Sequence, residues 1–358
     1  VPNVSLSFSS VGTPILTDEN GTFFTSVSST WSGTITASKA GHQFSPDTLS
    51  ISSETAETIQ LTFLASRSQI LYVDATATGN GDGSSWANAY PELSTALQSM
   101  HPFTEVWVAS GTYKPGVFRS DFFLLPPNVS IYGGFSGLES SRTERNSTTN
   151  QTILSGDIGN INDGSDNTFH VVVPSNESHL EGFIIQDGNA SENYSDSRGK
   201  GGGLYAEGVN FSISECIFQG NRARQQGGAA YLLDTNATFS NCTFSNNLAS
   251  SGGALDITDS KVTILDSNFS GNQSDYAGGA IAALNSIISV SSGTFSLNQI
   301  NLNNGGGAIN AEYGSLILTD CTFNQNQATL DGGAIDAEKL DLNTTNCVFT
   351  NIRNSMNN

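Results

Sequence analysis

The chain has 358 residues, with 33 Asp and Glu against 13 Lys and Arg and a formal net charge of −20. This charge argues against nucleic acid and anionic membranes as partners. Only 13 % of the residues are charged, about half of the usual share, and no apolar run approaches the roughly 18 residues of a membrane-spanning helix. Since the chain begins at Val1 without an initiator Met or a signal peptide, we expect a processed or excised form.

Short alternating runs separated by turn residues predict a small β-sandwich in residues 1–65. The runs lie at 4–8, 21–24, 31–36, 48–51 and 58–63. The stretch 31–46, which reads Trp-Ser-Gly-Thr-Ile-Thr-Ala-Ser-Lys-Ala-Gly-His-Gln-Phe-Ser-Pro, resembles the Ig-like, carboxypeptidase-regulatory-like modules of secreted proteins. The resemblance implies a spacer or a binding unit.

Residues 66–105 are expected to form a linker and a cap. Residues 72–74 have strand patterning, and residues 91–100 predict an amphipathic helix. Its apolar face would carry Leu93, Ala96, Leu97 and Met100. Because an open solenoid end exposes a sheet edge and an apolar cross-section, a helix over the first coil is a suitable cover.

The remaining residues, 106–358, predict a solenoid whose first part is irregular. Strand-like runs lie at 106–109, 129–133, 152–154, 169–173 and 183–185. Long polar loops at 134–150, 155–167 and 187–199 separate them, and loops of this size on a rigid scaffold are where function concentrates.

From residue 201 onward two motifs repeat together. Glycine pairs begin at Gly201, Gly227, Gly252, Gly278, Gly306 and Gly332. Phe-x-x-Asn motifs begin at Phe218, Phe244, Phe269, Phe295 and Phe323, and Phe349 continues the frame. Both series advance by 26, 25, 26, 28 and 26 residues. Because the two motifs show the same irregular spacings, they occupy two constant positions in one repeating structural unit. A repeat of this length indicates a solenoid.

The pattern within one repeat predicts a right-handed parallel β-helix with three short strands per coil of about 26 residues. Residues alternate with period two, as in strands, and no helical period appears. Stacked coils cover each other's apolar faces. The Phe side chains should form an internal ladder, the glycine pairs should lie at sharp corners, and the Asn residues should form an amide ladder at turns, where Asn tolerates left-handed backbone.

The paired motifs over residues 201–352 resemble the GGA[ILV]/FxxN repeats of the polymorphic outer-membrane protein (Pmp) family of surface adhesins. The runs Leu-Tyr-Val-Asp at 71–74, Gly-Gly-Phe at 133–135 and Ile-Leu-Ser-Gly-Asp at 153–157 look like the entry coils of secreted β-helix proteins with such repeats. The resemblance implies an extracellular adhesin. Family members continue into an outer-membrane barrel, whereas this sequence stops at Asn358.

The four cysteines all precede a ladder Phe by two residues. Cys216 should lie over Cys242, and Cys321 over Cys347. One interpretation is small buried thiols. The other is two disulfides, Cys216–Cys242 and Cys321–Cys347, because a coil spacing of about 4.8 Å lies within the permitted range of Cα separations.

The best candidate ligand site is a basic and aromatic group for carbohydrate. It comprises Arg198, Arg222, Arg224, Tyr205 and Tyr231, with Lys200 nearby. Arg198 and Arg224 are 26 residues apart, as are Tyr205 and Tyr231, so each pair could stack on adjacent coils. The alternative is that these are solvated loop residues. The four histidines do not gather, and none has zinc-ligand spacing.

Two further kinds of site are open. The oxygen-rich loop 156–166, with Asp157, Asn162, Asp163 and Asp166, could bind Ca²⁺, although Asx-rich turns are common without metal. Fourteen Asn-x-Ser/Thr sequons occur, and several loop sites could be glycosylated in a suitable host. The candidates are Asn128, Asn146, Asn176, Asn189 and Asn193.

We therefore predict a non-enzymatic extracellular or cell-surface protein that is adhesin-like and part of a fibre or filament. The alternative is a carbohydrate-active β-helix that binds or cleaves a polysaccharide. Cofactors other than Ca²⁺ are not expected. The interactions expected are a second copy stacked head to tail or a longer continuation of the chain, and a cell-surface or glycan ligand.

Overall fold

The structure is a computed structural model that describes residues 1–9, 11–28, 30–39, 42–52, 60–67, 70–99, 105–161, 163–192, 197–302, 305–329 and 332–354. Met100, His101, Asn162 and Asn193 lie outside these ranges. The chain divides into two compact units, Val1–Ile70 with His101–Glu105, and Leu71–Met100 with Val106–Asn358. The first boundary therefore lies near residue 70, and the cap segment belongs to the second unit.

The first unit is a small antiparallel β structure. Its described strands form a sheet in the order β2-β1-β3-β5 and a separate β4–β6 pair. Their bounds are β1 (Ser5–Phe8), β2 (Val11–Leu16), β3 (Gly33–Ser38), β4 (His42–Ser45), β5 (Thr48–Ile51) and β6 (Leu64–Arg67). Val4, Leu6, Phe8 and Ile35 are buried between them.

Several strands of this unit differ from the prediction. The run 21–24 and residues 60–63 of the predicted run 58–63 are not strands, whereas Val11–Leu16, His42–Ser45 and Leu64–Arg67 are. Strand β2 contains Pro14 and, among the described residues, pairs with β1 alone. A proline is tolerated there because an edge strand needs hydrogen bonds on one side only.

The second unit begins with the cap. Strand β7 (Ile70–Val73) is followed by the short helices η1 (Trp86–Asn88) and α1 (Leu93–Gln98). Leu93, Ala96 and Leu97 are buried in the solenoid core, as the predicted helical face requires. The helix is shorter than predicted and ends at Gln98.

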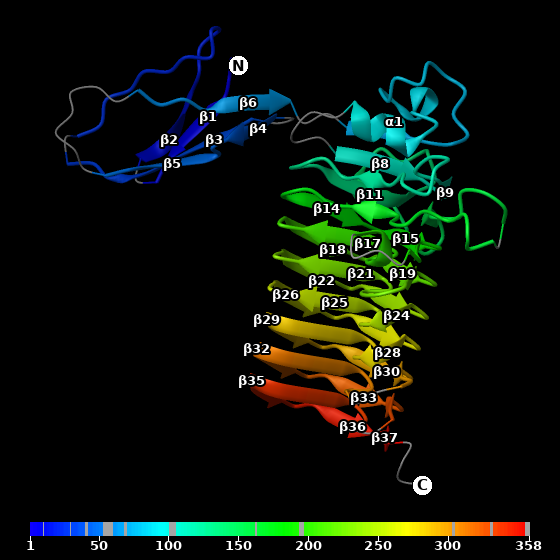
Figure 1. The fold of residues 1–358 in the computed structure, drawn as a ribbon. Coiled ribbons are helices and arrows are strands. Elements are labelled where there is room, and N and C mark those ends of the chain that lie inside the picture. Colours follow the sequence, from blue (N-terminus) through cyan, green and yellow to red (C-terminus); the bar gives the residue numbers. More distant parts are fainter. Residues whose placement is uncertain are drawn as a thin grey trace. The chain divides into compact units, whose positions relative to one another are not determined.

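The solenoid consists of three parallel sheets, each built from strands of the successive coils that are stacked in Figure 1. Among the described residues, the largest sheet has fifteen strands. They are β7, β8 (Glu105–Ala109), β10 (Phe123–Leu124), β11 (Ser130–Phe135), β13 (Val172–Val173), β14 (Ser178–Glu181), β17 (Leu204–Glu207), β18 (Asn210–Ser214), β21 (Ala230–Leu233), β22 (Asn236–Ser240), β25 (Leu255–Thr258), β26 (Lys261–Leu265), β29 (Ile281–Ser291), β32 (Ile309–Thr319) and β35 (Ile335–Thr345).

The second sheet carries the Phe residues. Its strands in the described part of the chain are β9 (Gly111–Tyr113), β12 (Thr152–Ser155), β15 (Phe183–Gln186), β19 (Ile217–Gln219), β23 (Thr243–Ser245), β27 (Asn268–Ser270), β30 (Thr294–Ser296), β33 (Thr322–Asn324) and β36 (Val348–Thr350). The third sheet contains β16 (Asn189–Ala190), β20 (Arg222–Ala223), β24 (Leu248–Ser251), β28 (Gln273–Ala277), β31 (Gln299–Ile300), β34 (Gln327–Ala328) and β37 (Arg353–Asn354).

The third sheet is a feature that the sequence did not reveal. In each coil, the short apolar run that follows the glycine pair and the alternating run after it belong to one sheet. In β29, β32 and β35 the two runs form one continuous strand. The third sheet follows the Asn of each Phe-x-x-Asn motif, where a turn was expected. Each coil thus has three sheet-forming sides, but they divide the sequence differently from the prediction.

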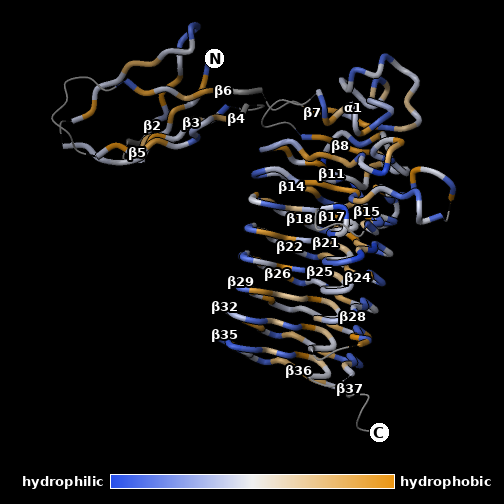
Figure 2. The backbone as a smooth tube through the Cα atoms, viewed as in Figure 1, coloured by the Kyte–Doolittle hydropathy of each residue, from blue (hydrophilic) through white to orange (hydrophobic). Residues whose placement is uncertain are grey.

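The predicted Phe ladder is confirmed. Consecutive rings from Phe218 to Phe349 are stacked, with centroids 4.7–5.0 Å apart and planes within 10° of parallel. Phe218, Phe244, Phe269 and Phe323 are fully buried. Burial of each such ring stabilises the folded state by about 2–3 kcal/mol. Figure 2 shows the alternation of apolar and polar residues along the coils that produces this core.

The amide ladder is also confirmed, although its backbone geometry differs from the prediction. Asn272 donates from Nδ2 to Oδ1 of Asn298 at 2.9 Å, and the same bond links Asn221, Asn247 and Asn326 along the column. These Asn residues are not left-handed. The residue before them has the positive φ, for example Asn246 (54°) and Leu297 (59°).

The glycine pairs occupy corners where no side chain fits. Gly227 has a φ of +65°, and a Cβ on Gly228 would lie 2.3 Å from the carbonyl oxygen of Gly253 in the next coil. The corner therefore needs glycine for both its backbone conformation and its close approach. No helix in the described residues is long and apolar enough to cross a membrane.

Candidate carbohydrate-binding site

Three aromatic rings are stacked on the outer side of the coils that carry β17 and β21. Tyr205 lies in register with Tyr231, and their rings are 5.6 Å apart and nearly parallel. The ring of His170 lies 5.1 Å from Tyr205 on the opposite side. Nδ1 of His170 is 2.9 Å from the carbonyl oxygen of Gly201. The predicted Tyr205–Tyr231 pair is therefore present, and His170 extends it.

Lys200 lies over Tyr231, the ring of this stack that is farthest from His170. Its Nζ donates to the Tyr231 hydroxyl at 3.2 Å and lies 4.5 Å from the centroid of that ring. Because Tyr231 is only 3 % exposed, the ring that a sugar could reach is Tyr205, which is partly exposed. The Tyr205 hydroxyl donates to Glu207 at 2.6 Å.

A buried carboxyl group occupies the next rung of the same column. Asp256 is in register with Tyr231 and is 4 % exposed. Its two carboxyl oxygens accept hydrogen bonds from Gln226 Nε2 at 3.0 Å and Ser251 Oγ at 2.6 Å. Burial raises the pKa of Asp256 to about 7, and the hydrogen bonds and the positive charge of Lys200 oppose this rise only in part.

Little in the sequence singles out Asp256 as a site residue. The residue at this position changes from coil to coil, through Tyr205, Tyr231, Asp256, Ala282, Asn310 and Asp336, so no acidic column marks it. The available signal was a charged residue next to a glycine pair on an apolar run, where burial is expected.

The predicted arginines lie on adjacent coils. Lys200 forms a bridge with Gln226, and Gln225 N donates to the Gly199 carbonyl at 2.9 Å. This register aligns the segment of Arg198, in η3 (Ser197–Gly199), with the segment of Arg224. Arg222 and Arg224 are exposed, and Arg198 is partly exposed. Four of the chain's 13 Lys and Arg thus lie within residues 198–224.

Carboxylate oxygens in the predicted Ca²⁺ loop accept hydrogen bonds from other residues of the same loop. Asp163 Oδ1 accepts from the Ser165 amide at 3.0 Å and from its hydroxyl at 2.6 Å, and these bonds lower the pKa of Asp163. Asp166 Oδ2 accepts from the Asn160 amide at 2.7 Å. Among the described residues, no three His, Cys, Asp or Glu side chains are placed to hold a metal. With Asn162 undescribed, Ca²⁺ binding through Asp157 and its neighbours stays a prediction.

The four cysteines are free thiols in the structure, and Cys347 is less buried than the others. Burial raises the pKa of Cys242 to about 12 and that of Cys321 to about 11, so these thiols are poorly reactive. Whether either pair can oxidise to a disulfide stays a prediction.

The sequons differ in accessibility. Asn128, Asn146 and Asn176 are exposed. The Oδ1 of Asn146 accepts from the Thr148 amide, and that of Asn176 accepts from the Asn210 amide. Asn189 is partly buried, and its Nδ2 donates to the Gly164 carbonyl. Glycosylation at these positions stays a prediction.

Comparison with known proteins identifies the fold. Residues 202–357 match the family model described as a right handed beta helix region, which confirms the predicted right-handed parallel β-helix. The match does not extend to the first unit. No curated protein matches the chain.

Solved structures of similar fold are pectin methylesterases. One is a mutant in complex with a hexasaccharide; it is 11 % identical, covers 72 % of this chain and 80 % of its own, and has a TM-score of 0.38. Another, the enzyme from Aspergillus niger in deglycosylated form, is 13 % identical, covers 81 % of this chain and 88 % of its own, and has a TM-score of 0.36. At this similarity the likeness concerns the fold alone, and no residue role is transferred.

These structures nevertheless correct one prediction. We predicted a non-enzymatic protein because a repetitive solenoid with few basic groups suits an adhesin. The two structures named above are enzymes, so the prediction of a non-enzymatic protein is corrected, because a fold of this kind does not exclude catalysis.

Proposed function

We propose that the protein is a carbohydrate-active β-helix protein that binds an acidic polysaccharide over the coils of Arg198, Lys200, Arg222 and Arg224. The observation that supports this proposal is the gathering of these four cations on two adjacent coils of a chain whose net charge is −20. Elsewhere the acidic chain repels a polyanion, so binding is confined to this cationic patch.

The side chains in the patch suit a uronate polymer. Arginine binds a carboxylate through two parallel hydrogen bonds, and a partly exposed tyrosine such as Tyr205 provides an apolar face and a hydroxyl for a sugar ring. Because the coils repeat at strand spacing, about 4.8 Å, cations on adjacent coils form a row that a polymer can follow.

The same region contains a group suited to proton transfer. Asp256, whose pKa is raised to about 7, is near the protonation midpoint at neutral pH, which is where general acid–base catalysis is most effective. The ammonium of Lys200 lies on the neighbouring Tyr231. Because Asp256 and Tyr231 are buried, we propose that Lys200, which is partly exposed, contacts the substrate and that Asp256 and Tyr231 position it.

Binding to polygalacturonate, with a neutral glucan as the comparison polymer, tests the proposal. We expect binding to polygalacturonate alone, weakened by salt because the contacts are ionic. The double variant Arg222→Ala/Arg224→Ala should lose about tenfold or more in affinity. Lys261→Ala, which removes an exposed cation from β26, should bind as the wild type does.

Equal affinity for the neutral glucan, or unchanged affinity in the double variant, would contradict the proposed site. Absorbance near 235 nm during incubation with the same polymer measures β-elimination. A product in the wild type that is lost in Asp256→Asn would place catalysis at this site.

We also propose an extracellular location and a Pmp-like assignment of the repeats. The low share of charged residues and the exposed sequons at Asn128, Asn146 and Asn176 support the location. The alignment of the motif residues Phe218, Phe244, Phe269 and Phe295 in one column supports the assignment.

A further inference from the structure

A second polar cluster lies on the outer face of the largest sheet, on strands β11, β14 and β18. Two columns of side chains form it by register. Ser130, His179 and Ser212 make one column, and Tyr132, Glu181 and Ser214 make the other. Except for Tyr132, which is buried, these residues are partly exposed. Side chains of different chemistry are therefore neighbours within reach of solvent.

A chain of two hydrogen bonds connects Ser212, His179 and Glu181. Ser212 Oγ lies 2.8 Å from His179 Nδ1, and His179 Nε2 lies 2.9 Å from Glu181 Oε2. An ionised carboxylate only accepts hydrogen bonds, so Nε2 carries the imidazole proton. Nδ1 then has a lone pair and accepts the Ser212 hydroxyl proton. This tautomer is inferred from the partners of the two nitrogens.

Burial and two nearby arginines favour the neutral form of His179. Arg142 and Arg145 come from the loop that contains η2 (Arg142–Glu144). Burial, and then the positive charges of these two arginines, lower the pKa of His179. Glu181 and Glu215, which both pair with Arg145, are the acidic groups nearby. At neutral pH the imidazole is therefore a base.

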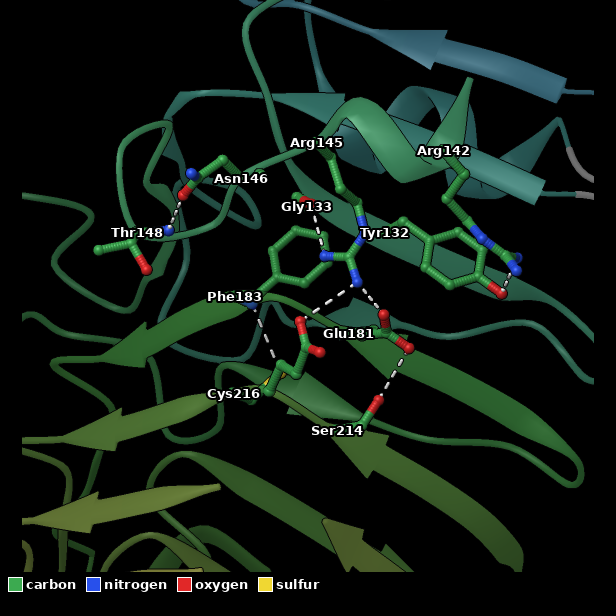
Figure 3. Close-up of polar contacts among 12 residues, drawn as sticks. Tyr132, Gly133, Arg142, Arg145, Asn146, Thr148, Glu181, Phe183, Ser214 and Cys216 are labelled. Carbon is green, nitrogen blue, oxygen red and sulfur yellow. Dashed lines mark hydrogen bonds and ion pairs between the residues drawn. The ribbon is translucent and has the colours of Figure 1, made fainter. Parts of the chain in front are cut away.

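Figure 3 shows how the loop holds the carboxylate in place. Arg145 reaches Glu181 and donates to the Gly133 carbonyl at 3.2 Å, and Ser214 Oγ donates to Glu181 at 2.9 Å. Arg142 donates to the Tyr132 hydroxyl at 2.7 Å and lies over that ring. Ser212 takes part in none of these contacts of Arg142 and Arg145. Its hydroxyl is therefore not required to hold the loop that contains η2 in position.

We propose that Ser212, His179 and Glu181 form a nucleophilic site that hydrolyses carboxylic esters with small acyl groups. Ser212 is the nucleophile, His179 the base, and Glu181 the group that orients the imidazole. In serine proteases Nε2 of the histidine faces the serine and Nδ1 faces the carboxylate. Here Nδ1 faces Ser212 and Nε2 faces Glu181, and the proton transfers are the same. This proposal does not depend on polysaccharide binding at the cationic patch.

The reaction proceeds in two balanced steps. Ser212 Oγ bonds to the acyl carbon while its proton passes to His179 Nδ1, and the ester C–O bond then breaks as the leaving alcohol takes that proton. Water next attacks the acyl-serine and gives a proton to Nδ1; the acid leaves and Ser212 regains its proton.

Hydrolysis of p-nitrophenyl acetate, together with labelling by a fluorophosphonate, tests this site. We expect turnover by the wild type and a label on Ser212 in peptide mass spectra. Ser212→Ala should lose the label and at least about 100-fold in rate. Thr238→Ala alters the next rung of the same column and should leave both unchanged.

The pH profile adds an independent readout. The rate should rise with pH as His179 loses its proton, with a midpoint below the ordinary histidine value of about 6.5, because burial and the arginines lower its pKa. Equal melting temperatures for Ser212→Ala and the wild type would show that folding is intact. Equal rates in the two proteins, or a label on another residue, would overturn the proposal.

Discussion

The inner and outer columns of side chains along the solenoid use the same sheets in different ways. Inner columns of the regular coils from Phe218 to Phe349 repeat one residue, as in the Phe and Asn ladders. Outer columns change residue at each rung, as from Ser130 to His179 to Ser212, and from Tyr231 to Asp256 to Ala282. Identical columns add stability, whereas mixed columns bring different chemical groups together.

Removing a ring from the middle of the Phe ladder should have the largest effect on stability. Phe269 is fully buried between Phe244 and Phe295. We expect Phe269→Ala to lower the free energy of unfolding by about 3–5 kcal/mol, because it removes stacking on both faces and leaves a cavity. Urea unfolding followed by circular dichroism measures this change.

The matched control is Phe349→Ala. Phe349 is 47 % exposed and stacks on one ring in the described residues, so we expect a loss of about 1 kcal/mol. Equal losses in the two variants would mean that ladder position does not matter, and the comparison between identical and mixed columns would lose its energetic basis.

A mixed column should instead have an effect that depends on pH. The pKa of Asp256 in the fold, about 7, exceeds the unfolded value, so the native state binds the proton more tightly. Stability should therefore fall as pH rises from about 4 to about 7, by about 4 kcal/mol as an upper bound. Asp256→Asn removes this titration.

Thermal unfolding at pH 5 and pH 8 checks this expectation. We expect the melting temperature of Asp256→Asn to exceed that of the wild type by a smaller margin at pH 5 than at pH 8. Asp341→Asn, in which an exposed carboxyl group is removed, controls for the loss of one charge. The same difference from the wild type at both pH values would contradict the assigned pKa.

The repeating part of the fold was predictable because its determinants recur. A Phe and an Asn at a shared period specify both ladders, and the glycine pairs specify the corners. The third sheet was missed because strands such as Arg222–Ala223 and Gln299–Ile300 are too short to show alternation. A strand of two residues has no period.

The sites were less predictable because they depend on register between coils of unequal length. Tyr205 and Tyr231 could be paired because they are one repeat apart. His179 and Ser212 are 33 residues apart, outside the repeat, and only the length of the intervening loop brings them into register. Asp256 was overlooked because the residues in register with it on the adjacent coils, Tyr231 and Ala282, are not acidic.

The most direct test of the proposed function is a crystal structure of the protein with an oligogalacturonide. The account predicts sugar carboxylates within hydrogen-bond distance of the Arg222 and Arg224 guanidinium groups, with a sugar ring beside Tyr205. A saccharide bound on another face of the solenoid, or none at a saturating concentration, would contradict it.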